Sequence, residues 1–259
     1  LKTNISAFSP ASSSLYAATY AGGITGINAG TIIDCTNGGS ISSSASSSKH
    51  SPSCHTGGIA GYNRMGSIRH CNNTGSITAF ATSIFYHLYV YSGGITGYNY
   101  DGFVANCYNN GTVSVPSAIS YTDAQLGGIV GHNSKTISNC YNTGSVSALV
   151  YASSSATASY ARAGGITGVN AGTISDCYNI ESISASVSSI SNVSSSCAWA
   201  GGIVGCNHRD INNCYNIGDV FASVSSAASS AYMGGIAGSD SGTLNNGYYL
   251  DTIPNGVGA

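Results

Sequence analysis

The nine cysteines of this sequence are the side chains that could form disulfides, bind a metal or pack in a core. Six of them recur at nearly regular intervals and form one column: Cys35, Cys71, Cys107, Cys140, Cys177 and Cys214. If successive members lay on neighbouring strands, about 4.8 Å apart, that separation would fall within the Cα–Cα range that a disulfide accepts. Cysteine is also a small hydrophobic side chain that packs well in a core. Packing and disulfide bridging, within or between molecules, therefore both stay open for this column.

The other three cysteines, Cys54, Cys197 and Cys206, have no counterpart at the same place in neighbouring intervals. Because nine is an odd number, at least one thiol stays free or bonds to another chain, and these three are the candidate intermolecular thiols. The sequence has no Cys-x-x-Cys, and its cysteines and histidines do not cluster, which disfavours a zinc site. We expect neither a metal nor a cofactor.

The carboxylates do not form a catalytic pair. Polysaccharide lyases and hydrolases need carboxylates close together, whereas the nine acidic residues here are spread along the whole chain. Asp34 and Asp176 share a position in the pattern, but four intervals, about 19 Å, would separate them. His132 and His208 have no acid or nucleophile that the sequence places beside them. The sequence therefore predicts a protein that is not an enzyme.

Aromatic side chains form two groups. A tyrosine stripe follows the cysteine column at the next residue: Tyr108, Tyr141, Tyr178, Tyr215 and Tyr248. A second cluster precedes pairs of glycines: Tyr20, Tyr91, Trp199 and Tyr232. Stacked, exposed tyrosines can bind sugar rings, form a lateral contact between molecules or stabilise a ladder. Contact or stabilisation is favoured, because sugar sites usually add charged hydrogen-bonding groups that the sequence does not place here.

These residues must be positioned by a repeat that covers nearly the whole chain. The pattern Gly-Gly-Ile-x-Gly opens at Gly22, Gly57, Gly93, Gly127, Gly164, Gly201 and Gly234, so successive copies are 35, 36, 34, 37, 37 and 33 residues apart. Each copy holds three or four short β-prone runs separated by turn residues, such as 173–178 and 182–187. This pattern predicts an all-β fold, a right-handed parallel β-solenoid (β-helix) of about seven rungs with roughly 35 residues per rung. A β-propeller is the alternative, but its blades need four antiparallel strands joined by hairpin turns.

We divide the chain into three parts: an N-terminal strand or end segment at 1–21, the seven-rung solenoid at 22–247 and a C-terminal end segment at 248–259. Stacking the copies produces three apolar columns, which begin at Ile24, Ile32 and Ile41 and should form the core.

Two asparagine columns follow the first and second strands of each copy. The first contains Asn28, Asn63, Asn99, Asn133, Asn170 and Asn207, and the second contains Asn37, Asn73, Asn109, Asn142, Asn179 and Asn216. Asparagine tolerates left-handed corner geometry, and its amide can bond to the same amide one rung away. We therefore expect corner ladders at these positions in preference to ligand sites.

The composition excludes several partners. Charged residues make up 6% of the chain and its net charge is −2, so no field attracts nucleic acid or anionic lipid. No run of 18 apolar residues is present, which argues against membrane insertion. A polar surface with few charges repels its own copies only weakly. Residues 1–20 and 248–259 also contain few of the charges and prolines that block a strand edge, so we expect copies of the chain to associate.

The repeated unit, read at 127–146 as GGIVGHNSKTISNCYNTGSV, resembles the GLUG-motif repeat over residues 22 to about 247. That resemblance implies a secreted or cell-surface protein whose repeats form a display or binding scaffold, with chemistry in other domains. The fifth copy departs from the pattern at Glu181 and Ser182, and the seventh lacks the cysteine. The composition also resembles, more weakly, the sheath proteins of archaeal methanogens.

Together these features predict an extracellular structural protein that self-assembles through stacked rungs and lateral contacts into a sheath, surface layer or filament. The alternative is an adhesin stalk, or a glycan- or host-binding module of a larger surface protein, with surface glycans as partners.

Overall fold

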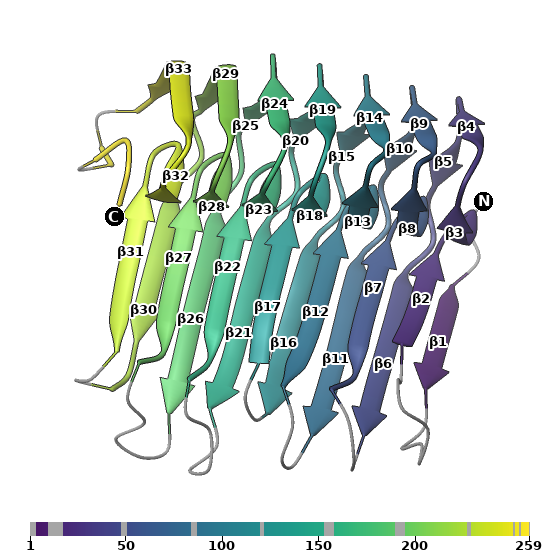
Figure 1. The fold of residues 1–259 in the computed structure, drawn as a ribbon, viewed down its shortest axis with the longest axis horizontal. Helices are drawn as coiled ribbons and strands as arrows, with labels where there is room; N and C mark the ends of the chain where they lie inside the picture. The colour runs from purple at the N-terminus through teal and green to yellow at the C-terminus, as the bar shows by residue number, and fades with distance from the viewer. Residues whose placement is uncertain are drawn as a thin grey trace.

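The computed structural model describes residues 4–9, 18–47, 51–83, 87–119, 122–152, 158–189, 195–226, 229–250, 252–253 and 255–258. Over these residues the chain is all β, and it contains no helix that could cross a membrane. Strands of successive rungs pair in parallel, which confirms the β-solenoid (Figure 1). Six turns of about 36 residues lead from Ile5 in the first rung to Val220 in the seventh. The handedness of the coil stays a prediction.

Two sheets of seven strands form the lower half of the view in Figure 1, and their strands run in opposite directions. Sheet A contains β1 (Ile5–Ser9), β6 (Ile41–Ser47), β11 (Ile77–Ser83), β16 (Val113–Ile119), β21 (Val146–Ala152), β26 (Ile183–Ser189) and β30 (Val220–Val224). Sheet B contains β2 (Ala18–Gly22), β7 (Ser53–Gly57), β12 (Leu88–Gly93), β17 (Thr122–Gly127), β22 (Tyr160–Gly164), β27 (Cys197–Gly201) and β31 (Ser230–Gly234). Their inward side chains meet in one core cluster, represented by Ile77, Val90 and Leu126.

The upper half consists of sheet C, with seven strands, and sheet D, with twelve, all of them short except β29 and β33. Sheet C contains β3 (Thr25–Asn28), β8 (Ala60–Arg64), β13 (Thr96–Tyr100), β18 (Val130–Asn133), β23 (Thr167–Asn170), β28 (Val204–Asn207) and β32 (Ala237–Asp240). Sheet D contains β4 (Thr31–Ile33), β5 (Thr36–Asn37), β9 (Ser67–Arg69), β10 (Asn72–Asn73), β14 (Phe103–Ala105), β15 (Tyr108–Asn109), β19 (Thr136–Ser138), β20 (Tyr141–Asn142), β24 (Thr173–Ser175), β25 (Tyr178–Asn179), β29 (Asp210–Asn216) and β33 (Thr243–Tyr249). A second core cluster fills this half, and it contains the first apolar column from Ile59 onward and the second from Ile68 to Ile211, whereas Ile24 at the N-terminal end is exposed.

The glycine pairs are required by close contact between rungs. A Cβ on Gly128 would lie 2.2 Å from Cγ of Asn142 and equally close to the carbonyl oxygen of Gly165 in the next rung. A Cβ on Gly127 would lie 2.0 Å from the carbonyl oxygen of Val130. The turn between sheets B and C therefore has no room for a side chain at either position, which explains why the pair recurs in every copy.

The stack extends beyond residues 22–247, because β1 and β2 pair with β6 and β7, and β33 continues to Tyr249. Of the two end segments, residues 1–3, 10–17, 251, 254 and 259 lie outside the described residues.

The two ends of the stack differ. At the C-terminal end the tail folds back on the last rung, where Gly235 N donates to Asn255 O at 2.7 Å and Ile236 N to Gly256 O at 2.9 Å. At the N-terminal end Phe8, Ile27 and Ile33 are exposed. The C-terminal end is therefore not the open strand edge that its composition suggests.

Candidate functional site

All nine cysteines are described, and none of them forms a disulfide. The column of six lies in the core of sheets C and D, with Cys35 as its half-buried N-terminal member. Each sulfhydryl donates to the carbonyl two residues earlier, as in Cys177 Sγ to Ser175 O at 3.1 Å. Burial raises the pKa of the Cys177 thiol well above its ordinary value, so it stays protonated and is a poor nucleophile or metal ligand.

The hypothesis that Cys54 and Cys206 bond to another molecule is wrong, because both side chains are buried. Burial also raises the pKa of each thiol to about 12. Cys54 points into the core between sheets A and B, where its sulfhydryl donates to Phe80 O at 3.2 Å. Cys197 is half-buried on sheet B and stays a candidate intermolecular thiol.

Both asparagine columns form continuous hydrogen-bonded ladders. In each ladder Nδ2 donates to Oδ1 of the next rung at 2.7–2.9 Å, from Asn28 to Asp240 in one and from Asn37 to Asn216 in the other. The amide also closes its own turn: Asn142 Nδ2 donates to Gly144 O at 2.6 Å, and Gly144 N donates back to Asn142 Oδ1 at 3.3 Å. The ladder asparagines are buried, so their polar groups are satisfied within the protein.

The left-handed corners are not at the ladder asparagines, and that part of the expectation is wrong. A φ between 50° and 55° occurs instead at the residue before each cysteine position: Asp34, His70, Asn106, Asn139, Asp176, Asn213 and Asn246. Asparagine, aspartate and histidine are the side chains enriched in this region. The ladder asparagines connect rungs, and the residues before the cysteines turn the chain.

The tyrosine stripe is a uniform outward ladder. The ring centroids of Tyr108, Tyr141, Tyr178 and Tyr215 are 5.0, 4.9 and 4.9 Å apart, with interplanar angles of 3–5°. Tyr248 stands opposite Tyr215 in the strand register. The stripe repeats one contact, so it offers a ligand no feature that distinguishes one of these rungs from another.

A second surface changes from rung to rung. Two residues before each glycine pair, the outward side chains of sheet B are in turn Tyr20, His55, Tyr91, Gln125, Arg162, Trp199 and Tyr232. The facing column on sheet C is Ile27, Tyr62, Tyr98, His132, Val169, Cys206 and Ser239. We call these two columns, with the adjacent Tyr89, Asp123 and Tyr160 on sheet B, the aromatic corner.

Side chains of the two sheets touch in the aromatic corner, so the outer faces of sheets B and C meet at an inner angle. The ring centroids of Tyr91 and Tyr98 are 5.2 Å apart, and those of His55 and Tyr62 are 5.5 Å apart. The His55 ring also lies between Tyr20 and Tyr91, at 4.8 and 4.9 Å. Contacts of this kind contribute about 0.5–1.5 kcal/mol each beyond their buried area.

A chain of polar contacts occupies the fourth and fifth rungs of the corner. Arg162 forms an ion pair with Asp123, and Gln125 Nε2 donates to Asp123 Oδ2 at 3.0 Å. Gln125 Oε1 lies 2.7 Å from His132 Nδ1. Only 17% of the Arg162 side chain and 13% of the Asp123 side chain are exposed, so water screens this pair weakly.

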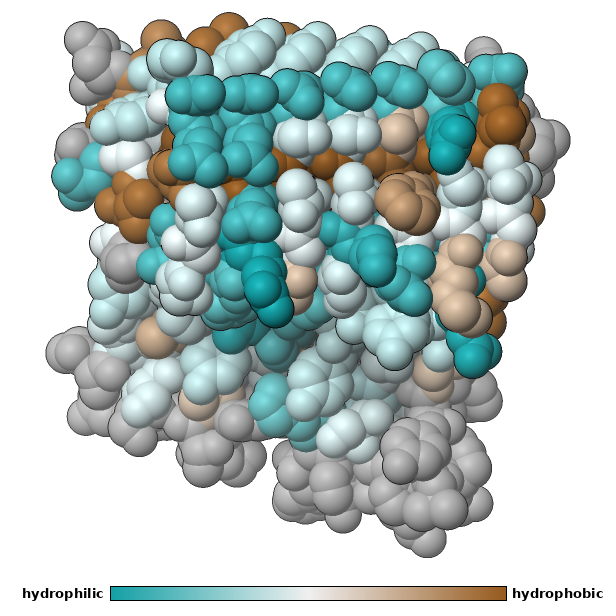
Figure 2. All heavy atoms as spheres, turned by 45° about the horizontal axis from the view of Figure 1, so that its top comes forward, coloured by the Kyte–Doolittle hydropathy of each residue, from teal (hydrophilic) through white to brown (hydrophobic). Residues whose placement is uncertain are grey.

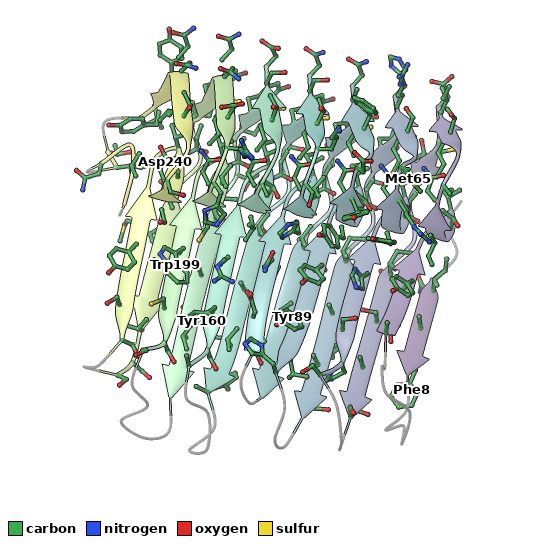
Figure 3. All side chains as sticks on the ribbon, in the orientation of Figure 1. Phe8, Met65, Tyr89, Tyr160, Trp199 and Asp240 are labelled. Carbon is green, nitrogen blue, oxygen red and sulfur yellow. The ribbon has the colours of Figure 1, made fainter. Side chains whose placement is uncertain are left out.

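Aromatic rings hold the arginine from the other side. The Arg162 guanidinium carbon lies 4.9 Å from the Tyr160 ring centroid and 5.0 Å from that of Trp199, within cation–π range. Figure 3 shows Tyr89, Tyr160 and Trp199 along the same face of the stack, on β12, β22 and β27. The polar rungs are thus flanked by aromatic rungs on both sides.

The aromatic corner carries no net charge at neutral pH. The charges of Asp123 and Arg162 cancel. Burial lowers the pKa of His55 to about 3 and that of His132 to about 4, so both imidazoles are neutral. Nδ1 of His55 is buried and has no hydrogen-bond partner within the described part of the chain.

Sequence reasoning recognises Tyr20, Tyr91, Trp199 and Tyr232 as a group but misses the rungs between them. The expectation that charged hydrogen-bonding groups are missing is wrong for this cluster. Asp123 and Arg162 are 39 residues apart and of different types, so no column of identical residues reveals them. The available signal is that every residue two places before a glycine pair has a planar end group.

Two segments of the stack match a known family. The model of the GLUG motif matches residues 53–78 and 123–147. The matched segments run from β7 into β11 and from β17 into β21, and each includes a glycine pair, members of both asparagine ladders and a cysteine of the column. No curated protein and no solved structure matches the chain significantly.

Proposed function

This chain is a GLUG-repeat protein, and from that premise we propose that it is an adhesin-like extracellular module that binds a ligand along its aromatic corner without catalysis. One observation carries the proposal. In all seven rungs the residue two places before the glycine pair has a planar side chain on the outer side of sheet B, with His55 and Gln125 buried by their neighbours, and the middle of this column holds a hydrogen-bonded polar group of four residues. Binding sites are mostly apolar and aromatic, with a few fixed polar groups that orient the ligand.

The rest of the fold supports this role by holding the corner rigid. Both ladders and both cores continue through the rungs that carry the aromatic corner, and from the second rung to the sixth each corner residue is attached to a strand that is paired on either side within the stack. Binding groups on strands are placed more accurately than groups on loops. Figure 2 shows a band of hydrophobic side chains along the stack axis with a row of hydrophilic ones beside it, so surface character continues along the rod.

An adhesion assay tests the proposal. Beads coated with the folded chain are passed over surfaces of extracellular polymer separated into polysaccharide and protein fractions. Retention should fall at least about tenfold for Trp199→Leu and for Tyr91→Leu, which keep apolar bulk but remove a planar face. Tyr178→Leu makes the same kind of change in the tyrosine stripe and should bind like the wild type. Equal retention of all four proteins would contradict a ligand site at the aromatic corner.

Self-assembly is the second candidate, and the N-terminal end of the stack favours it. Phe8 is 67% exposed there, and Ile27 and Ile33 are 48% and 49% exposed. An exposed apolar sheet end invites pairing with another chain. At the opposite end, however, the ladders stop at Asp240, which has no amide to donate, and at Tyr249, which stands opposite Asn216. Assembly would therefore use N-terminal ends or lateral faces.

Electron microscopy and sedimentation of the purified chain at neutral pH, with and without reductant, test this candidate. Ordered sheets or fibres that disappear in Phe8→Asp and Ile33→Asp variants would assign assembly to the N-terminal end. Loss of the same structures in reductant would assign the joint to thiols, with Cys197 as the half-buried candidate. Discrete rods in every condition would remove self-assembly from the proposal and leave ligand binding untouched.

A further inference from the structure

The spacing of the aromatic corner suits a long ligand that lies along the stack axis. Neighbouring rungs are about 4.8 Å apart, so the line from Tyr20 to Tyr232 covers six steps, about 29 Å. The phenols, the guanidinium and the indole of this line are at least partly exposed, whereas the imidazole of His55 and the amide of Gln125 are buried by their neighbours. A compact ligand would contact one or two of the exposed steps, whereas an extended polymer could contact all of those that are exposed.

The chemistry of the steps suits sugar units. A pyranose ring offers a C–H face that packs on an aromatic ring, and its hydroxyls both donate and accept hydrogen bonds. The aromatic rungs, represented by Tyr91 and Trp199, supply the flat apolar faces. The polar rungs supply a carboxylate acceptor at Asp123 and a guanidinium donor at Arg162, both already held in place.

The same polar rungs disfavour a proline-rich peptide, which also docks on aromatic surfaces. Proline has no backbone N–H, so such a peptide presents carbonyl acceptors and few donors. The carboxylate of Asp123 would then face acceptors and lose hydrogen bonds to water without replacement.

Charge decides which saccharides fit. The Asp123 carboxylate and the Arg162 guanidinium neutralise each other, and burial keeps His55 and His132 neutral. A polyanionic glycan would find no excess positive charge along this line, and its own charges would lose water where they approach Asp123. An uncharged chain avoids that cost.

We infer that the aromatic corner binds an uncharged, extended polysaccharide with its chain parallel to the stack axis and about one sugar unit per rung. This inference rests on the proposed function and specifies its ligand. Because the column runs from the first rung to the seventh, affinity should rise with chain length until the oligosaccharide spans the corner.

Calorimetry with the full chain tests this inference on four probes: cello-oligosaccharides of two to seven units, manno-oligosaccharides of the same lengths, oligogalacturonate and a proline-rich peptide. One neutral series should bind, with affinity rising over the whole length range and changing less than about twofold between 50 and 500 mM salt. Trp199→Leu and Gln125→Ala should each weaken the longest neutral probe by tenfold or more. Tyr178→Leu, with circular dichroism to confirm folding of every variant, should leave it within twofold.

The possible failures are distinguishable. Binding of oligogalacturonate or of the peptide, weakened by the same corner variants, would overturn the neutral polysaccharide and leave the proposed binding function standing. Affinity that stops rising at two or three units would overturn the axial arrangement. If no probe and no extracellular polymer responds to the corner variants, the proposed function fails together with the inference.

Discussion

The asparagine ladders and the aromatic corner run through the same seven rungs in the same parallel register, but they use that register in opposite ways. In the ladders nearly every rung repeats one residue, and each amide donates to the amide above it at 2.7–2.9 Å. In the corner one position is in turn tyrosine, histidine, tyrosine, glutamine, arginine, tryptophan and tyrosine.

The two regions differ because a side chain in a repeated column contacts copies of itself, whereas one in a varied column contacts other residue types. A parallel stack places identical positions about 4.8 Å apart, so a repeated residue must be complementary to itself. A primary amide and a phenol ring meet that condition, whereas a column of arginines or aspartates would repel itself. Arg162 and Asp123 are accommodated because they occur once each and pair with one another. Identical positions therefore report what stabilises the stack, and the varied positions are those at which we propose that a ligand binds.

The largest effect should come from a change that breaks the stack itself. Gly128→Ala places a methyl group 2.2 Å from both Asn142 Cγ and Gly165 O, so neighbouring rungs must separate. We expect a loss of 3 kcal/mol or more, on the order of the largest single-residue effects, or failure to fold. Gly30→Ala is the matched control, since its Cβ would have no atom within 4 Å. Urea unfolding followed by circular dichroism measures both, and equal stability of the two variants would refute the steric account of the glycine pair.

Breaking one ladder in the middle should cost somewhat less. Asn142→Ala removes the acceptor of Gly144 N and the donor to Asn179 Oδ1, both of them buried. Each unsatisfied group costs about 1–3 kcal/mol, so we expect a loss of about 2–4 kcal/mol in the free energy of unfolding. Asn110→Ala is the control, because Asn110 is exposed and outside the ladder. Its change should stay within about 0.5 kcal/mol, and a similar loss at both positions would mean that the ladder does not carry this stability.

The repeated half of the comparison could be predicted from the sequence, because identical residues that recur every 33–37 residues have one in-register stacking. Ile41 opposite Ile77 and Tyr141 opposite Tyr178 follow directly from it. The pairing of Ile5 with Ile41 does not follow from the repeat, because no glycine pair precedes Ile5 to mark the first strand. The left-handed turns at Asp176 and its equivalents were also missed, since three residue types share that position.

The varied half could not be predicted in the same way. Tyr98 and Tyr91 face each other only because sheet C leaves sheet B at an inner angle, and no periodicity encodes that angle. The chain of contacts from Arg162 through Asp123 and Gln125 to His132 joins unlike residues of two neighbouring rungs and two sheets, so it becomes visible only when the strands are placed side by side. The burial of Cys54 and Cys206 could not be predicted either, because neither cysteine has an equivalent in adjacent rungs that would place it in a column.

Lowering the pH should destabilise the aromatic corner but not the ladders, because the buried histidines belong to the corner. The expected loss of unfolding free energy is smaller than that for breaking a ladder. The folded-state pKa of His55, about 3, is below its ordinary value, so protons bind the unfolded chain first as pH falls. Stability should be full above about pH 6.5 and decrease from there toward pH 3. Tyr20 and Tyr91 occupy the equivalent position in the two neighbouring rungs, so tyrosine should fit at position 55. His55→Tyr should reduce the loss of unfolding free energy between pH 7 and pH 5 by about 2 kcal/mol. Urea unfolding at the two pH values measures this, and an unchanged pH dependence in His55→Tyr would show that the imidazole is not held neutral.

The smallest effect should come from the tyrosine stripe, which resembles the corner in composition and the ladders in repetition. Tyr178 stacks on Tyr141 and Tyr215 at 4.9 Å on each side but lies on the outside of sheet D. Tyr178→Ala should therefore cost about 1 kcal/mol in unfolding free energy, through the two lost ring contacts. If repetition marks a stacking role, the same variant should keep wild-type affinity for any ligand of the aromatic corner in calorimetry. A loss of ligand binding without a loss of stability would reverse the comparison, because it would make a repeated column the binding surface.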